Sequence, residues 1–95
     1  MLTIDEYVTS VLMRDLVGHD KRPVSFLIYL WLLAEQKRRD SPVRISYQEL
    51  AESIGISKSS AQTAVGHLAR RKLIAVSKAT ATATPEYKVL SPWRR

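Results

Sequence analysis

Small polar side chains in the second half of the chain are of the types that read the edges of DNA base pairs. On an α-helix spanning residues 57–71, Ser59 and Thr63 fall on the outward face, with Gln62 and His67 at its flanks. Short hydroxyl and amide groups suit hydrogen bonding in the major groove, and a glutamine amide can form two bonds to adenine. The sequence therefore predicts a base-reading set of Ser59, Gln62, Thr63 and His67.

Basic residues and helix-capping serines surround this face and are candidates for contacts with DNA phosphates. Free amides at the start of a helix bind anions, and Lys or Arg neutralises phosphate charge; such contacts position a protein on DNA without reading its sequence. Arg44, Arg94 and Arg95 could add nonspecific attraction. The predicted backbone contacts are Ser46, Ser57, Lys58, Arg70, Arg71, Lys78 and Lys88.

Gly66 lies within the same helix, where glycine costs about 1 kcal/mol relative to alanine. On an outward face it would allow the helix backbone to approach DNA closely. It could equally be a tolerated defect or a slight bend. The sequence leaves both interpretations open.

Charge is unevenly distributed along the 95 residues, whose formal net charge is +6. Residues 1–20 carry one base and four acids, a net charge of −3, whereas residues 57–95 carry eight bases and one acid, a net charge of +7. A basic excess in one part of a chain is typical of a face that binds a polyanion, although a solvated basic tail would have the same composition.

Composition excludes several classes of protein. The chain has no cysteine, so it has neither a disulfide framework nor a thiolate metal site, and we expect a cytoplasmic location. The acidic N-terminus lacks the features of a secretory signal. Residues 24–34 form the longest apolar run, which is short of the roughly 20 residues that span a bilayer, so we expect no membrane contact.

Catalytic patterns are absent from the sequence. His19 and His67 have no second histidine or carboxylate at ligand spacing, so both are expected to be solvated. No glycine-rich phosphate loop or nucleophile elbow occurs. We expect no enzyme activity, no metal, no cofactor and no small-molecule ligand.

An amphipathic helix is predicted over residues 3–18. Thr3 and Glu6 have the spacing of a capping box, and Gly18 offers a left-handed stop. Apolar residues recur every three or four positions, at Ile4, Tyr7, Val8, Val11, Leu12 and Leu16.

A second helix should begin near Pro23 and end in the basic cluster at residues 37–39, since Pro42 prevents its continuation. Its centre, residues 26–33, is apolar on all sides, so both faces must be covered. The first helix and the C-terminal half could cover one face each. A partner subunit is the remaining possibility, and we therefore favour a homodimer in which the first helix takes part in packing or pairing.

Two short capped helices follow a minimal strand at residues 43–45. Ser46 and Glu49 form a second capping box, Gly55 ends the first of these helices, and Ser57 caps the next. Residues 73–78 and 86–90 read as two strands. The alternating Ala-Thr stretch at residues 79–84 between them could be extended strand or a mobile loop tip.

The stretch from Leu50 to Leu68 resembles the helix-turn-helix of bacterial winged-helix regulators, including the GntR-type repressors and related plasmid replication initiators. Ala51 must be small where the two helices cross, and Gly55 must turn the chain. Lys72 departs from the resemblance, because it stands where glycine is usual, and this departure leaves the end of the helix open.

The resemblance implies a mostly α-helical fold with a small β-hairpin wing: a single winged helix-turn-helix domain over residues 23–90, preceded by the helix at 3–18 and followed by a tail at 91–95. The recognition helix, residues 57–71, would enter the major groove, and the wing, residues 73–90, would lie over the minor groove or backbone. Whether Trp93 packs on the domain or stays exposed is open.

The function implied is sequence-specific binding of double-stranded DNA by a homodimeric transcriptional regulator. Two alternatives remain. The chain could be a winged-helix module that binds protein, since a fold alone does not establish function. It could also be the DNA-binding part of a plasmid replication initiator, although such initiators usually carry two winged-helix units.

Overall fold

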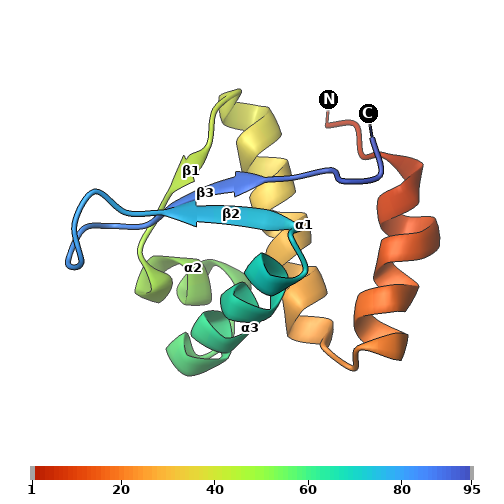
Figure 1. Cartoon of the computed structure of the whole chain (residues 1–95), viewed down its shortest axis with the longest axis horizontal. Helices are drawn as coiled ribbons and strands as arrows, with labels where there is room; N and C mark the ends of the chain where they lie inside the picture. Colours follow the sequence, from red (N-terminus) through yellow and green to blue (C-terminus); the bar gives the residue numbers. More distant parts are fainter. Residues whose placement is uncertain (1, 95) are drawn as a thin grey trace.

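A computed structural model of the chain describes residues 2–94 and has its elements in an order typical of a winged helix with an added N-terminal helix (Figure 1). The N-terminal helix comprises two segments, η1 and η2, and forms an antiparallel pair with the long helix α1 (Figure 1). The predicted fold class, mostly α-helical with a small β-hairpin wing, is confirmed. The elements are η1 Val8–Leu12, η2 Arg14–His19, α1 Pro23–Arg39, β1 Val43–Arg44, α2 Tyr47–Ile54, α3 Lys58–Arg70, β2 Ile74–Ser77 and β3 Glu86–Val89.

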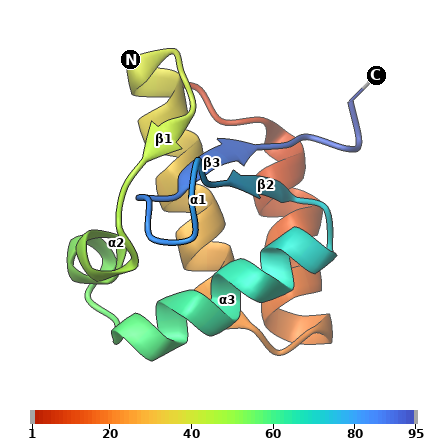
Figure 2. The same ribbon diagram turned by 60° about the vertical axis from the view of Figure 1, so that its left-hand side comes forward.

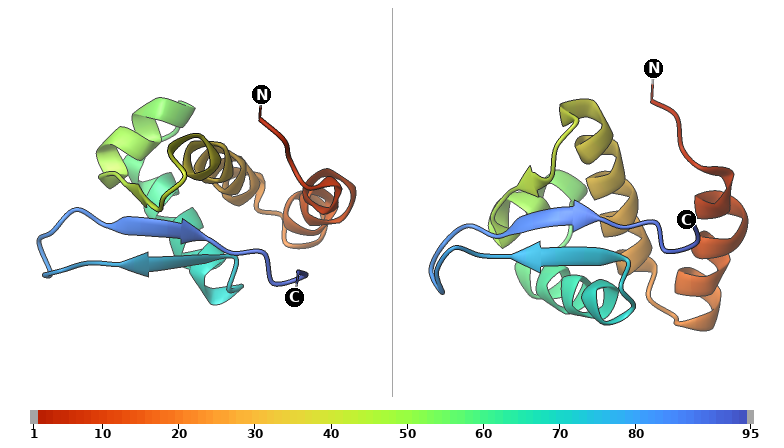
Figure 3. Two further views of the ribbon diagram at one scale, coloured as in Figure 1. Left: turned by 90° about the horizontal axis from the view of Figure 1, so that it is seen from above. Right: turned by 45° about the horizontal axis from the view of Figure 1, so that its top comes forward.

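The three strands form one antiparallel sheet in the order β1-β3-β2. Val43 of β1 and Val76 of β2 both pair with Tyr87 of β3, so β3 is the central strand. The link between β2 and β3 projects from the body of the molecule (Figure 3). Residues 79–84 within it are loop rather than strand, with a turn in which the Ala83 amide donates to the Thr80 carbonyl at 3.2 Å.

Helix α1 is the centre of the fold, as its apolar sequence predicts. It lies between the N-terminal helix on one side and the sheet and α3 on the other (Figure 1). Ile28, Tyr29 and Leu32 are fully buried, whereas Leu27 remains 46% exposed. Most of its surface is therefore covered within one chain. Among the described residues, no helix has the length and apolar character needed to cross a bilayer.

Polar groups of α1 fix it to β3. The Gln36 amide donates to the Val89 carbonyl at 3.4 Å, and its oxygen accepts from the Val89 amide at 2.7 Å. This pair of bonds continues the sheet where β1 has ended. The Tyr29 hydroxyl donates to the Leu90 carbonyl at 2.9 Å, and burial raises the pKa of Tyr29 to about 12.

Helices α2 and α3 are capped and joined as predicted. The hydroxyls of Ser46 and Ser57 accept hydrogen bonds from the amides of Glu49 and Ser60, each at 3.1 Å. Gly55 ends α2 with a φ of 90°, a left-handed conformation that glycine adopts without strain. The cap, turn and cap of the helix-turn-helix therefore follow from local chemistry.

Lys72 resolves how α3 ends. Its φ is 59°, so a lysine adopts the left-handed conformation in which glycine is usual. The Lys72 amide donates to the Ala69 carbonyl and the Leu73 amide to the Leu68 carbonyl, both at 3.0 Å. This is the hydrogen-bond pattern of a Schellman motif, closed by the buried side chains of Leu68 and Leu73. The Lys72 side chain itself is exposed.

The N-terminal helix differs from the predicted one in its start. Thr3 and Glu6 do not form a capping box; the Asp5 carboxylate accepts from the Tyr7 amide at 2.9 Å and fills that role. The hydrogen bond that the Tyr7 amide donates to the Asp5 carboxylate is the largest cause that lowers the pKa of Asp5.

The hydrogen-bond pattern and the C-terminal end of the N-terminal helix also differ from the prediction. The segments η1 and η2 are π-helical, with bonds between residues five apart, such as the Asp20 amide to the Asp15 carbonyl at 2.8 Å. In this wider winding the side chains four apart, Val8, Leu12 and Leu16, face the core, whereas Ile4 and Val11 are exposed. Gly18 continues the helix, and Lys21, at φ 56°, makes the left-handed turn instead.

The C-terminal tail packs on this helix. The Trp93 ring stacks on Tyr7 with ring centres 4.4 Å apart, and its indole nitrogen donates to Asp5 at 3.1 Å. Arg94 also pairs with Asp5, at 2.9 Å, so it neutralises a carboxylate of its own chain rather than standing free. Arg95 lies outside the described residues.

Candidate nucleic-acid interface

Helix α3 presents two distinct faces. Ala61, Ala64, Val65 and Leu68 are buried against α1 and α2, as predicted. Ser59, Gln62 and Thr63 are exposed, and Figure 2 shows α3 lying across one side of the molecule with that side uncovered by another element. No hydrogen bond links the side chain of Gln62 or Thr63 to another described residue, while the Ser59 hydroxyl lies 3.2 Å from that of Ser57. Three of the four predicted base-reading residues thus share one accessible surface.

The Arg70 side chain lies beside Gly66 of the same helix. Its guanidinium nitrogen would lie 3.4 Å from a Cβ atom placed on Gly66, an ordinary contact. Arg70 makes no ion pair with a described carboxylate, so its charge is available to a ligand. Because Gly66 has no side chain, the flexible side chain of Arg70 is the group that lies near the α3 backbone at this position.

His67 does not belong to the exposed surface. Its Nδ1 lies 2.8 Å from the Ser25 hydroxyl, and its Nε2 lies 2.9 Å from a carboxylate oxygen of Asp20. Only 12% of its side chain is exposed. The expectation that His67 is solvated and far from a carboxylate is wrong, because the start of α1 and the end of η2 pack against that flank of α3. We leave His67 out of the base-reading set.

Asp20 joins the N-terminal helix to α3. Its carboxylate accepts hydrogen bonds from the side chains of His19, His67 and Arg71. The hydrogen bond from His19 is the largest of the interactions that hold the pKa of Asp20 below its usual value. The same bond raises the pKa of His19. Asp20 is therefore a carboxylate whose ionised form is stabilised by the fold.

Arg71 is paired rather than free for phosphate. Its guanidinium binds Asp15 and Asp20 through separate nitrogen atoms. The hydrogen bond to Asp15 is the largest of the interactions that raise the pKa of Arg71. A phosphate would have to displace both carboxylates, so Arg71 connects α3 to the N-terminal helix and does not stand with Arg70 as an open cation.

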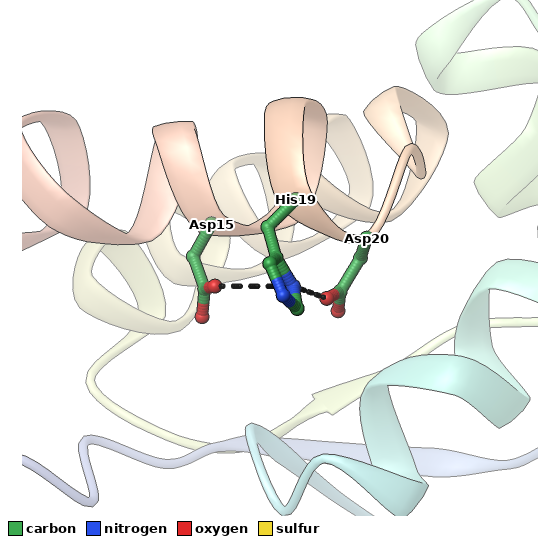
Figure 4. Close-up of side chains that lie close together, drawn as sticks. All are labelled: Asp15, His19 and Asp20. Atoms are coloured by element: carbon green, nitrogen blue, oxygen red, sulfur yellow. Dashed lines mark hydrogen bonds and ion pairs between the residues drawn. The ribbon is translucent and has the colours of Figure 1, made fainter.

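Figure 4 shows Asp15, His19 and Asp20 grouped at the end of η2. His19 Nδ1 lies 3.9 Å from Asp15 and 2.9 Å from Asp20, and the ligand atoms of the three side chains lie within 4.8 Å of one another. His19 therefore does have carboxylates at ligand distance, contrary to expectation. Since Arg71 already binds the other oxygen of each carboxylate, we interpret the group as an ion-pair network.

Ser25, His67 and Asp20 form a hydrogen-bonded row that has the composition of a hydrolase triad. Ser25 is only 1% exposed, so its hydroxyl cannot reach a substrate. The row fixes the start of α1 against α3, and we assign it a structural role.

The predicted phosphate contacts separate into two groups. Ser46 and Ser57 cap their helices with their own hydroxyls, which leaves other first-turn amides unpaired, and Lys58 is exposed at the first position of α3. The Lys78 ammonium lies 6.0 Å from the centre of the Tyr47 ring, so the base of the wing lies near the start of α2. Ser57 and Lys58 thus border the exposed face of α3, whereas Ser46 and Lys78 lie at the start of α2.

Lys88 and Arg44 lie elsewhere. Lys88 lines a hollow of about 250 Å³ beside the end of α1, together with Gln36, Lys37, Asp40, Ser41 and Pro42. Arg44 pairs with Glu86 across the sheet at 3.2 Å. Neither side chain joins the surface around α3.

The structure adds residues that sequence patterns could not single out. Asp20 and Ser25 are distant in sequence from His67, and no periodicity relates them. The sequence does hold one signal for this ion-pair network: Asp15 and His19 are four residues apart, a spacing that brings side chains together on a helix. The acidic N-terminal helix and the basic C-terminal half are in fact ionic partners, through Asp5, Asp15 and Asp20.

Comparison with protein-family models, curated proteins and solved structures finds no match to this chain. The resemblance to winged-helix regulators therefore rests on the residues quoted above and on the order of the elements.

Proposed function

We propose that this protein is a sequence-specific DNA-binding regulator that inserts α3 into the major groove. The exposed row of Ser59, Gln62 and Thr63 carries this proposal, because short exposed polar side chains suit hydrogen bonding to base edges. Arg70, Lys58 and Lys78 supply positive charge around the row. The wing would lie over the minor groove or backbone, and a cytoplasmic location accords with a chain free of cysteine.

The phosphate contacts follow the placement of the side chains. We assign them to Ser46, Ser57, Lys58, Arg70 and Lys78. Arg71 is omitted because it binds Asp15 and Asp20, and Lys88 because it lies beside the end of α1. The exposed face of α3 carries no large apolar side chain of the kind that anchors protein interfaces, which favours DNA over a protein partner.

Base reading is tested with Gln62→Ala. Selection from random duplex DNA defines the preferred site, and anisotropy titrations then compare this site with single-base variants. Gln62→Ala should reduce discrimination at one base pair by about 1–3 kcal/mol. Gln48→Ala, on the exposed side of α2, is the matched control and should leave base preference unchanged. Unaltered preference in Gln62→Ala would contradict the assignment.

We also propose that two copies bind one site. The N-terminal helix exposes Val11, Met13 and Val17, apolar side chains that a second copy could cover. Two recognition helices would then contact half-sites about 34 Å apart. Sedimentation at roughly tens of micromolar should detect a dimer. Val17→Asp should dissociate it, whereas Ser10→Asp, an equal change in charge on the same helix, should not; a monomeric wild type would refute pairing.

A further inference from the structure

A hollow lies where the start of α1 meets the exposed face of α3. Its volume is about 290 Å³. One wall is formed by the segment that precedes α1, and the other by the first turns of α3, including Ser59 and Thr63 of the base-reading row. The lining residues are Lys21, Arg22, Pro23, Val24, Ser25, Ser59, Ser60, Thr63 and Ala64.

The lining has the chemistry of an anion site. It contains two cations and the exposed hydroxyl-bearing residues Ser59, Ser60 and Thr63, and it contains no carboxylate. Neither Lys21 nor Arg22 takes part in an ion pair with a described residue. Asp20, next to them in sequence, is occupied by His19, His67 and Arg71 and does not line the hollow. The two positive charges are therefore exposed side by side without a counter-charge.

The two walls are held in place by buried contacts. The Ser25 hydroxyl lies 2.8 Å from His67 Nδ1, which joins the start of α1 to α3 directly. Ser25 is 1% exposed and His67 is held in turn by Asp20, so this joint is shielded from water. The segment that carries Lys21 and Arg22 is consequently held beside the first turns of α3.

We propose that this hollow holds a phosphate of the DNA strand bordering the groove that α3 enters, with Lys21 and Arg22 as its cations. The inference rests on the proposed DNA binding, because Ser59 and Thr63 belong both to the hollow and to the base-reading row. A phosphate held there fixes how deeply and at what angle α3 lies in the groove. Lys21 and Arg22 are thus positioning residues that charge counting along the chain did not identify.

Removal of both charges tests the proposal. The variant Lys21→Gln/Arg22→Gln is compared with Arg14→Gln/Lys37→Gln, which also removes one arginine and one lysine, from exposed positions outside the hollow. Binding to a random-sequence duplex is measured by anisotropy at several salt concentrations. The slope of log affinity against log salt should fall by about 0.9 in the first variant, because one phosphate contact is lost and each contact accounts for about 0.9. The control should keep nearly the wild-type slope.

A second measurement separates this proposal from the proposed function. Inorganic phosphate is titrated into the protein while amide resonances are followed by NMR. Shifts at Ser59, Thr63 and Arg22 in the wild type, lost in the Lys21→Gln/Arg22→Gln variant, support the anion site. Duplex binding with the same slope in both variants would overturn the phosphate contact while leaving DNA binding intact. A wild type that binds no duplex would refute the proposed function, and phosphate shifts alone would then overturn the assignment to DNA.

Discussion

The helix-turn-helix and the N-terminal helix are both amphipathic, yet only the first has the form that its local sequence predicts. In α2 and α3 the serine caps, the left-handed Gly55 and the buried stripe all lie where short-range rules place them. The N-terminal helix starts at a different cap, winds as a π-helix and passes through Gly18. The two regions also differ in their partners, because the carboxylates of the N-terminal helix bind groups that are distant in sequence.

The N-terminal helix is shaped by such distant groups. Trp93 and Arg94 bind Asp5 at its start, while Arg71 and His67 bind Asp20 at its end. Each partner comes from the C-terminal half of the chain. The comparison therefore implies that this helix is part of the same cooperative unit as the helix-turn-helix and is not an independent appendage.

Leucine truncation in each region should have the largest effect. Leu16 and Leu68 are both 0% exposed, so Leu16→Ala and Leu68→Ala should each lower the free energy of unfolding by about 3 kcal/mol. Urea unfolding followed by circular dichroism measures this, with exposed Val11→Ala as a control expected to change it little. A loss below about 1 kcal/mol for Leu16→Ala would show that the N-terminal helix is not part of the cooperative unit.

Asp20→Asn tests the ionic joint between the two regions and should cost about 1–2 kcal/mol at pH 7. Because its folded pKa lies below the usual value of 3.8, ionised Asp20 contributes stability above pH 3.8, and this contribution is lost as pH falls through the folded pKa. The difference between wild type and variant, measured by urea unfolding, should therefore shrink as the pH falls below 3.8. Glu52→Gln, an exposed carboxylate on α2, should show little difference at pH 7 or in acid; a gap that persists in acid would contradict the ionic origin.

Lys72→Gly should stabilise the end of α3 by about 1 kcal/mol, because glycine removes the cost of a left-handed side chain at φ 59°. Lys58→Gly makes the same substitution at the first position of α3, where φ is not positive, and should be destabilising. Thermal unfolding of both variants checks the opposite signs. Equal signs would indicate an effect of charge rather than of backbone conformation.

Gly66→Ala should have the smallest effect on stability, an increase of about 0.5–1 kcal/mol, because its φ is not positive and the new methyl group meets only the end of Arg70. Thermal unfolding measures the gain. Duplex affinity of the same variant then distinguishes the two interpretations of this glycine. A weaker complex would indicate close approach of the backbone to DNA, and unchanged affinity would indicate a tolerated defect.

Much of the candidate surface on α3 can be predicted from the sequence, and the errors share one cause. Ser59, Gln62 and Thr63 were placed correctly because helical periodicity fixes which side of α3 faces the core. His67 lies on the same helix at its flank, where periodicity does not say whether water or another element is the neighbour. Arg71 was likewise counted as free charge because its partners, Asp15 and Asp20, lie far away in sequence.

The sequence alone determined the order of helices and strands, the caps of α2 and α3 and the inward face of α3, since each depends on bonds or spacing within a few residues. Tertiary structure decided the winding of the N-terminal helix, the pairing of its carboxylates with Arg71 and Arg94, and which cations remain open. The physical reason is the range of the interactions. Hydrogen bonds within a helix join near neighbours, whereas ion pairs and packing depend on which distant residues folding brings together.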